Sequence, residues 1–196
     1  LLHRIETTDT GVLVTPTLSF DERGHQVNHM TYYCVGWSGN GEKPVDFYPT
    51  AEDFVGEGGN FERPYAIVKN AEGVKAGTKI EGLEAVGGLH FSEITLEPEE
   101  ECSYLIFTGI TEDIQEIRNL SKTYTTREKV LEELEKTKAY WQEKVNVAYH
   151  TGDSDFNQFM HWVSFQPILR RIYGCSFLPH HDYGKGGRGW RDLWQD

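Results

Sequence analysis

The sequence has few cysteines and no long apolar run. Its three cysteines are widely spaced and odd in number, which gives neither a disulfide framework nor a Cys-x-x-Cys metal signature: Cys34, Cys102 and Cys175. This usage favours a reducing compartment, so we expect a cytoplasmic protein. No stretch approaches the ~18 apolar residues that a membrane helix needs, and the first residues do not resemble a signal peptide.

Basic residues are also in deficit. The 196 residues include 19 Lys and Arg against 31 Asp and Glu, a formal net charge of −12. Nucleic acids and anionic membranes are held mainly by Lys and Arg contacts to phosphate, so we expect neither as a partner. A local basic pocket for one small anion stays possible, and one cluster offers it: Lys185, Arg188 and Arg191, with Arg170 and Arg171 upstream.

What the sequence does have, over residues 1–110, is a series of short runs of β-forming residues. Five runs separated by Gly-rich and polar turns predict strands, at 12–20, 30–37, 65–68, 89–96 and 101–110. Many short strands with polar turns are typical of an antiparallel β-sandwich.

From residue 111 the pattern becomes helical. A short helix is marked by Ile114, Ile117 and Leu120, and a second, 125–146, by the capping box Thr125-x-x-Glu128. A third begins at 153–155 as N-cap and acidic first turn, and Pro167 should kink or restart it. Its aromatic stripe is interpreted as packing core. We therefore predict a partial β-sandwich domain (1–110), a helical linker (111–150) and a helical domain (151–196).

Residues 184–196 read GKGGRGWRDLWQD and pack charged, aromatic and glycine residues together. Carboxylates and Arg grip hydroxyls, Trp faces cover C–H surfaces, and glycine admits close backbone approach. The mixture suits a sugar. Because the sequence stops inside this motif, we expect a piece of a longer protein.

The C-terminal residues also allow other interpretations. His180, His181 and Asp182 lack a further ligand at a metal-binding spacing, so no metal is predicted. Asp192 and Asp196 resemble a two-carboxylate hydrolase pair, but four residues apart on a helix they would repel each other. A structural ion pair remains the plain alternative for Arg191 and Asp192.

Four stretches together resemble glycoside hydrolase family 94, the cellobiose-phosphorylase-like enzymes (glycosyltransferase family 36 in older naming). They are DTGVLVTPT (9–17), FVGEGGNFERP (54–64), FNQFMHWVSFQP (156–167) and GWRDLWQD (189–196). The last is the most specific. It is similar to the family's Gly-aromatic-Arg-Asp-x-x-Gln-Asp signature.

The resemblance implies an antiparallel supersandwich-like β-domain, a helical linker and the first helices of an (α/α)6 barrel. It implies an inverting phosphorylase, in which inorganic phosphate attacks a β-linked glucoside to give α-glucose 1-phosphate and a shortened acceptor. Phosphate is the co-substrate and no cofactor is implied. The general acid is expected beyond residue 196, so no catalytic residue is expected within this chain and the chain alone should be inactive.

The resemblance also assigns site residues, all expected to bind substrate. Asp192 and Arg191 would hold the transferred sugar, and either Lys185 or Arg188 would supply a basic group beside them. Trp190, Gln195 and Asp196 complete the predicted substrate-binding set. A homodimer is implied as well. Two alternatives stay open: a non-catalytic carbohydrate-binding or scaffolding module, and a hydrolase or transferase on the same scaffold.

Overall fold

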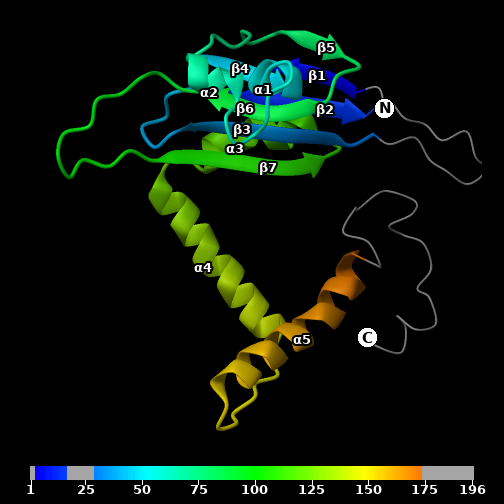
Figure 1. Ribbon diagram of the computed structural model, residues 1–196. Coiled ribbons are helices and arrows are strands. Elements are labelled where there is room, and N and C mark those ends of the chain that lie inside the picture. The colour runs from blue at the N-terminus through cyan, green and yellow to red at the C-terminus, as the bar shows by residue number, and fades with distance from the viewer. Residues whose placement is uncertain (1–2, 17–28, 174–196) are drawn as a thin grey trace, which may run out of the picture. The chain divides into compact units, whose positions relative to one another are not determined.

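The computed structural model describes residues 3–16 and 29–173, with side chains described as far as residue 169. The described residues divide into two units, the first ending at Val130 and the second starting at Leu131. The first unit contains all the described strands and the second is helical (Figure 1). No helix in the described part of the chain is long and apolar enough to cross a membrane.

The first unit is built on two antiparallel sheets. The larger has the order β5 (Lys79–Glu81), β1 (His3–Thr7), β2 (Gly11–Pro16), β3 (Thr31–Ser38) and β7 (Tyr104–Thr111). The smaller pairs β4 (Asp46–Thr50) with β6 (Ala85–His90). Strands that are far apart in the sequence lie side by side in this sheet. β3 pairs along its whole length with β7, from Thr31 opposite Thr111 to Ser38 opposite Tyr104.

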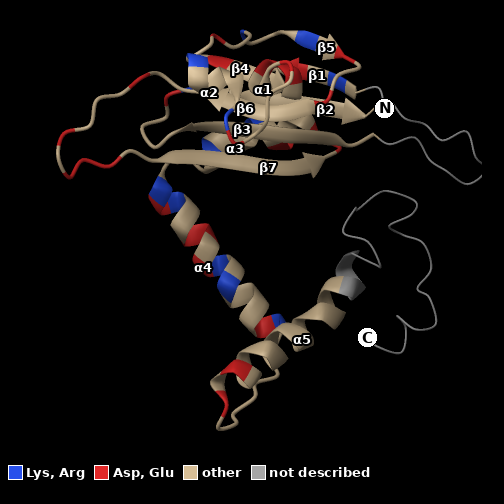
Figure 2. Cartoon of the chain, in the orientation of Figure 1, with Lys and Arg blue, Asp and Glu red and all other residues tan. Residues whose placement is uncertain are grey.

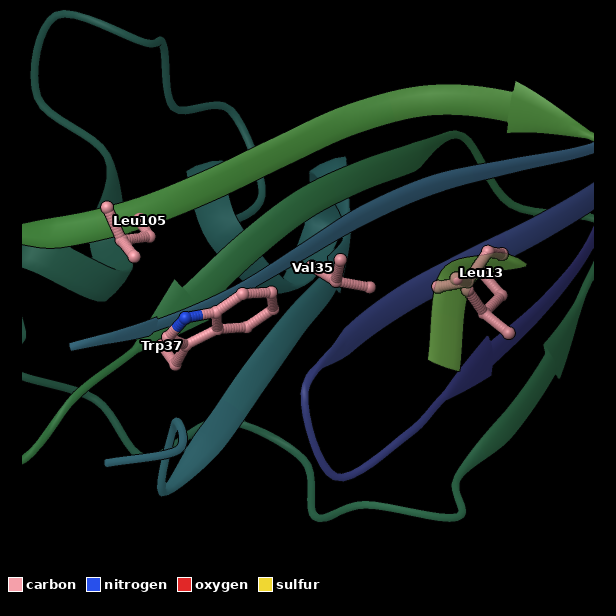
Figure 3. Packing of buried hydrophobic residues seen from close by; sticks show 5 residues of the cluster. Leu13, Val35, Trp37 and Leu105 are labelled. Atoms are coloured by element: carbon pink, nitrogen blue, oxygen red, sulfur yellow. The ribbon is translucent and has the colours of Figure 1, made fainter. Parts of the chain in front are cut away.

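The larger sheet buries side chains on both faces. On one face, Ile5 and Val12 meet Phe47 of the smaller sheet, and all three are 1% exposed. On the other, a cluster of Leu13, Val35, Trp37, Leu105 and Ile117 joins the sheet to α3 (Ile114–Thr123). Figure 3 shows the strand members of this second cluster close together on one side of the sheet.

The alternation along β3 explains this arrangement, because successive side chains of a strand point to opposite faces. Val35 and Trp37 lie on the helix face, and the Trp37 ring stacks on Phe107 with centroids 5.1 Å apart. Cys34 and Gly36 lie on the face toward β6. A Cβ added at Gly87 would be 2.5 Å from the Cys34 Cβ, so β6 approaches closely only because these residues are small.

The strand predictions were confirmed in part. The runs at 30–37 and 101–110 are β3 and β7, and the run at 12–20 is β2 as far as Pro16, with 17–20 outside the described residues. The run at 65–68 is wrong as a strand, since it forms the helix α2 (Tyr65–Lys69). The run at 89–96 contains only the end of β6, and 91–96 has no regular structure. Three strands, β1, β4 and β5, and the helix α1 (Ala51–Val55) were not predicted.

The helix predictions were closer. The short helix is α3, and the second is α4 (Arg127–Lys144). Because α4 begins at Arg127, Thr126 rather than Thr125 precedes it, and bonds from the Glu128 amide and Thr126 side chain lower the pKa of Glu128. Acidic and basic side chains alternate along α4 (Figure 2), including the predicted Glu132–Lys136 pair at 3.0 Å.

The third helix is α5 (Ser154–Tyr173). Its N-cap prediction was confirmed, since the Asp153 carboxylate accepts bonds from the Asp155 and Phe156 amides at 2.9 and 3.0 Å. Pro167 lies inside the helix and does not restart it. The core interpretation of the aromatic stripe does not hold among the described residues, where Phe156 is 45% and Phe159 61% exposed.

Candidate functional site

The predicted sugar-binding residues all lie outside the described residues: Lys185, Arg188, Trp190, Arg191, Asp192, Gln195 and Asp196. The structure brings none of them to a described position, so their roles stay predictions. The site whose geometry is visible lies in the first unit.

A cleft of about 790 Å³ lies in the first unit, and two other cavities measure about 410 and 230 Å³. It is bounded by α1, by the Gly-rich loop 56–64, by α2 and by residues 71–74. All four parts are consecutive in the sequence, so residues 52–74 alone make the whole cleft. We call it the α1–α2 cleft.

Two short helices and their caps fix the walls. Thr50 Oγ1 accepts a bond from the Asp53 amide at 3.1 Å at the start of α1, and Gly56 ends that helix with φ 81°. A Cβ at Gly56 would meet the Tyr65 Cβ at 2.7 Å, so glycine is needed there for both conformation and space. The side-chain oxygen of Asn60 accepts hydrogen bonds from the backbone amides of Glu62 and Arg63, both at 3.0 Å. These bonds fix the loop just before α2.

The floor of the cleft is tied to the smaller sheet. Val74 exchanges two backbone hydrogen bonds with Phe47, at 2.8 and 2.9 Å. The hydroxyl of Tyr48 donates to the Ala71 carbonyl. Burial, and secondarily the charge of Asp46, raise the pKa of Tyr48, so this hydroxyl keeps its proton and remains a donor at neutral pH.

The buried carboxylate of Asp46 packs against the same region. The Asp46 side chain is 4% exposed, and its Oδ1 lies 2.7 Å from His90 Nδ1 on the adjacent strand. Its Oδ2 lies 3.7 Å from Lys75 Nζ. A Cβ at Gly73 would be 2.8 Å from Asp46 Oδ1, so the 71–74 segment packs directly on this group. The buried charge is thus paired rather than isolated.

The cleft combines apolar and charged groups. Tyr65 and Val68 line it and are 52% and 51% exposed, whereas Phe61 and Ile67, each 67% exposed, lie in the same stretch of sequence but not among the lining residues. The charged side chains include four carboxylates and two cations: Glu52, Asp53, Glu57, Glu72, Arg63 and Lys69. Such a surface suits a polar ligand that also carries an apolar face.

The sequence indicates only part of this site. The 54–64 stretch belongs to the family resemblance, but the β-forming residues 65–68 predict a strand where the structure has α2, so the second wall of the cleft is not predicted. The Asp46–His90 pair gave no signal, because 44 residues separate its members and neither lies in a local motif.

The described residues contain no candidate metal site. Within residues 3–16 and 29–169, the side chains of His, Cys, Asp and Glu form no group of three or more that could hold an ion. Cys34 and Cys102 are free thiols. Burial raises the pKa of Cys34, which makes it a poor nucleophile.

Comparison with known families gives one result. The model of the family described as Glycosyl hydrolase 94, supersandwich domain, matches residues 8–127. The match spans the strands from β2 to β7, the α1–α2 cleft and α3, and it ends at the first residue of α4. A search of curated proteins found no match.

Proposed function

The chain belongs to glycoside hydrolase family 94, a carbohydrate-active enzyme family, through its supersandwich domain, and from that membership we propose that the whole protein is an inverting β-glucoside phosphorylase. The family match over 8–127 is the observation that carries the proposal. It is supported by the two sheets packed face to face, which agree with a supersandwich domain.

The proposed reaction needs few groups from the protein. An inverting glycosidase needs one acid for the leaving oxygen and one base to activate water. Inorganic phosphate is already an anionic nucleophile, so it replaces the activated water. The products are then α-glucose 1-phosphate and an acceptor shortened by one glucosyl unit.

We assign the transferred sugar to Asp192 and Arg191. The carboxylate would accept hydrogen bonds from two ring hydroxyls, and the guanidinium would donate to a hydroxyl or orient the carboxylate. Lys185 or Arg188 would supply the adjacent basic group. The general acid belongs to an (α/α)6 barrel that continues beyond residue 196, so the present chain should not turn over substrate.

The test is release of α-glucose 1-phosphate from a panel of β-linked gluco-disaccharides by the full-length parent, with and without inorganic phosphate. Phosphate-dependent product supports the proposal, and phosphate-independent sugar release would replace it with a hydrolase. Asp192→Asn should lower turnover by at least about 100-fold, since a charge-assisted contact to the reacting sugar is lost. The matched control is Asp155→Asn, an exposed carboxylate in the first turn of α5, which should leave turnover unchanged.

A further inference from the structure

The α1–α2 cleft has the features of a ligand site that the phosphorylase proposal does not use. We propose that it binds a neutral saccharide, as a carbohydrate site separate from residues 184–196. The inference does not depend on the phosphorylase activity, because it rests on the described residues of the first unit.

Its size is appropriate. A volume of about 790 Å³ lies within the range of small-molecule sites, roughly 300–1,000 Å³. The cleft opens to solvent along residues whose side chains are mostly exposed, which an oligosaccharide can enter from the side.

An apolar platform forms part of one wall. Tyr65 and Val68 line the cleft and are 52% and 51% exposed, and Phe61 and Ile67, each 67% exposed, lie in the same eight-residue stretch but not among the lining residues. Single exposed apolar residues are ordinary, but a contiguous group indicates a binding surface. An aromatic face such as that of Tyr65 can cover the C–H face of a pyranose ring.

Unpaired charges lie around this platform. The side chains of Glu57, Glu72, Arg63 and Lys69 form no ion pair or hydrogen bond with the described residues, although both signs are present in the same cleft. Some other exposed charges of the described residues do pair, as Lys136 with Glu133 at 2.6 Å. Carboxylates accept bonds from hydroxyls and cations donate to them, so a polyhydroxyl ligand satisfies both signs at once.

The balance of charge argues against an anionic ligand. Four carboxylates against two cations disfavour phosphates and other anions. A saccharide carries hydroxyl donors and acceptors without net charge, so it can bond to groups of both signs without repulsion. A basic ligand is attracted by the excess of carboxylates, and a hexalysine peptide serves as the probe for that alternative.

The walls are also held before a ligand arrives. The Thr50 cap, the Asn60 amide bonds and the Val74–Phe47 pairing fix three sides of the cleft. A site that is already ordered loses less conformational entropy on binding.

The experiment measures binding of cellotriose and laminaritriose to the 196-residue chain by isothermal titration calorimetry and saturation-transfer NMR. We expect binding in the millimolar range, and Tyr65→Ala should weaken it by about tenfold, while Tyr65→Phe retains it. Arg63→Ala and Glu72→Gln should each weaken it by about threefold to tenfold. Matched controls are Tyr104→Ala, an exposed tyrosine on β7, and Lys79→Ala, an exposed cation on β5; both should bind like the unaltered chain.

Two further arms separate the explanations. Asp192→Asn should keep this binding, and loss in that variant would place the saccharide at residues 184–196 and overturn the proposal. The proposal is also overturned if neither trisaccharide binds at up to about 10 mM, or if a hexalysine peptide binds instead. Circular dichroism of each variant checks that the fold is retained. A parent protein without phosphorolysis would leave these results unaffected, so the two proposals fail independently.

Discussion

The first unit and the described part of the helical unit differ in how deeply they bury their large apolar side chains. In the first unit the strands bury large side chains, such as Phe47 at 1% and Trp37 at 3% exposure. In the helical unit, α4 has no buried residue, and Phe159 and Trp162 of α5 are 61% and 57% exposed. The first unit therefore carries its stabilising contacts within itself, whereas the described helical residues leave much of their apolar surface uncovered.

Removing an indole from each unit tests this difference most strongly. Trp37→Ala should destabilise the first unit by about 3–5 kcal/mol, because it leaves a cavity in a packed core. It also removes the Nε1 bond to the Tyr124 carbonyl at 3.0 Å. Trp162→Ala should cost less than about 1 kcal/mol, since the ring is largely exposed. Urea unfolding followed by circular dichroism measures both; equal losses would contradict the comparison.

Charged pairs should show the same contrast with a smaller effect. Asp46→Asn should cost about 1.5–3 kcal/mol, because it weakens a buried, charge-assisted contact to His90. Lys136→Ala removes an exposed helix pair and should leave the free energy of unfolding nearly unchanged. The same unfolding experiment applies. A cost for Asp46→Asn as small as that of the exposed pair would show that the buried contact contributes no net stability.

Glycine substitutions sharpen the comparison further. A Cβ at Gly11 would overlap the Cys34 carbonyl oxygen, so Gly11→Ala should destabilise the sheet by about 1–3 kcal/mol. Gly152, before α5, has no atom within 4 Å of such a Cβ and no positive φ. Gly152→Ala should therefore be neutral or stabilising by up to about 0.5 kcal/mol. A neutral Gly11→Ala would mean that β2 and β3 separate more easily than the packing indicates.

The smallest expected effect is on pH dependence. Burial, followed by the charges near it, raises the pKa of Tyr33 above its ordinary 10.0, and burial raises that of Tyr48. The folded state then holds protons that the unfolded state has released, so stability should be unaffected below about pH 10 and should fall as the pH rises above it. Urea midpoints across this range measure it, and Tyr33→Phe should flatten the decline. A midpoint that stays constant would refute the expectation.

The sequence predicted those parts of the fold whose signal is local. The runs of β3 and β7 and the Asp153 cap of α5 need only their own residues to be recognised. β1 reads HRIET, where a single strongly apolar residue gives no clear alternation, and β4 contains Pro49, which argues against a strand. Both strands depend on partners distant in sequence.

The error at 65–68 has a physical cause. Tyr, Ile and Val favour strands, but Pro64 precedes the segment and Asn70 ends it in the left-handed conformation at φ 47°. Those two residues define a single helical turn that outweighs β-propensity. The α1–α2 cleft depends on that turn, so its second wall could not be predicted from propensity. The Asp46–His90 contact depends on the pairing of β4 with β6, so it could not be predicted from local sequence either. The roles of Arg191 and Asp192 stay predictions.

The two-sided sheet has a consequence for how this domain can change over evolutionary time. Tyr33, Val35 and Trp37 fill one side of β3, while Cys34 and Gly36 leave room for β6 on the other. Inserting or deleting one residue in this strand would exchange the sides and press the Trp37 indole against β6. Length variation among descendants of this chain should therefore be confined to the connecting loops, with β3 keeping its length even where its residues are replaced.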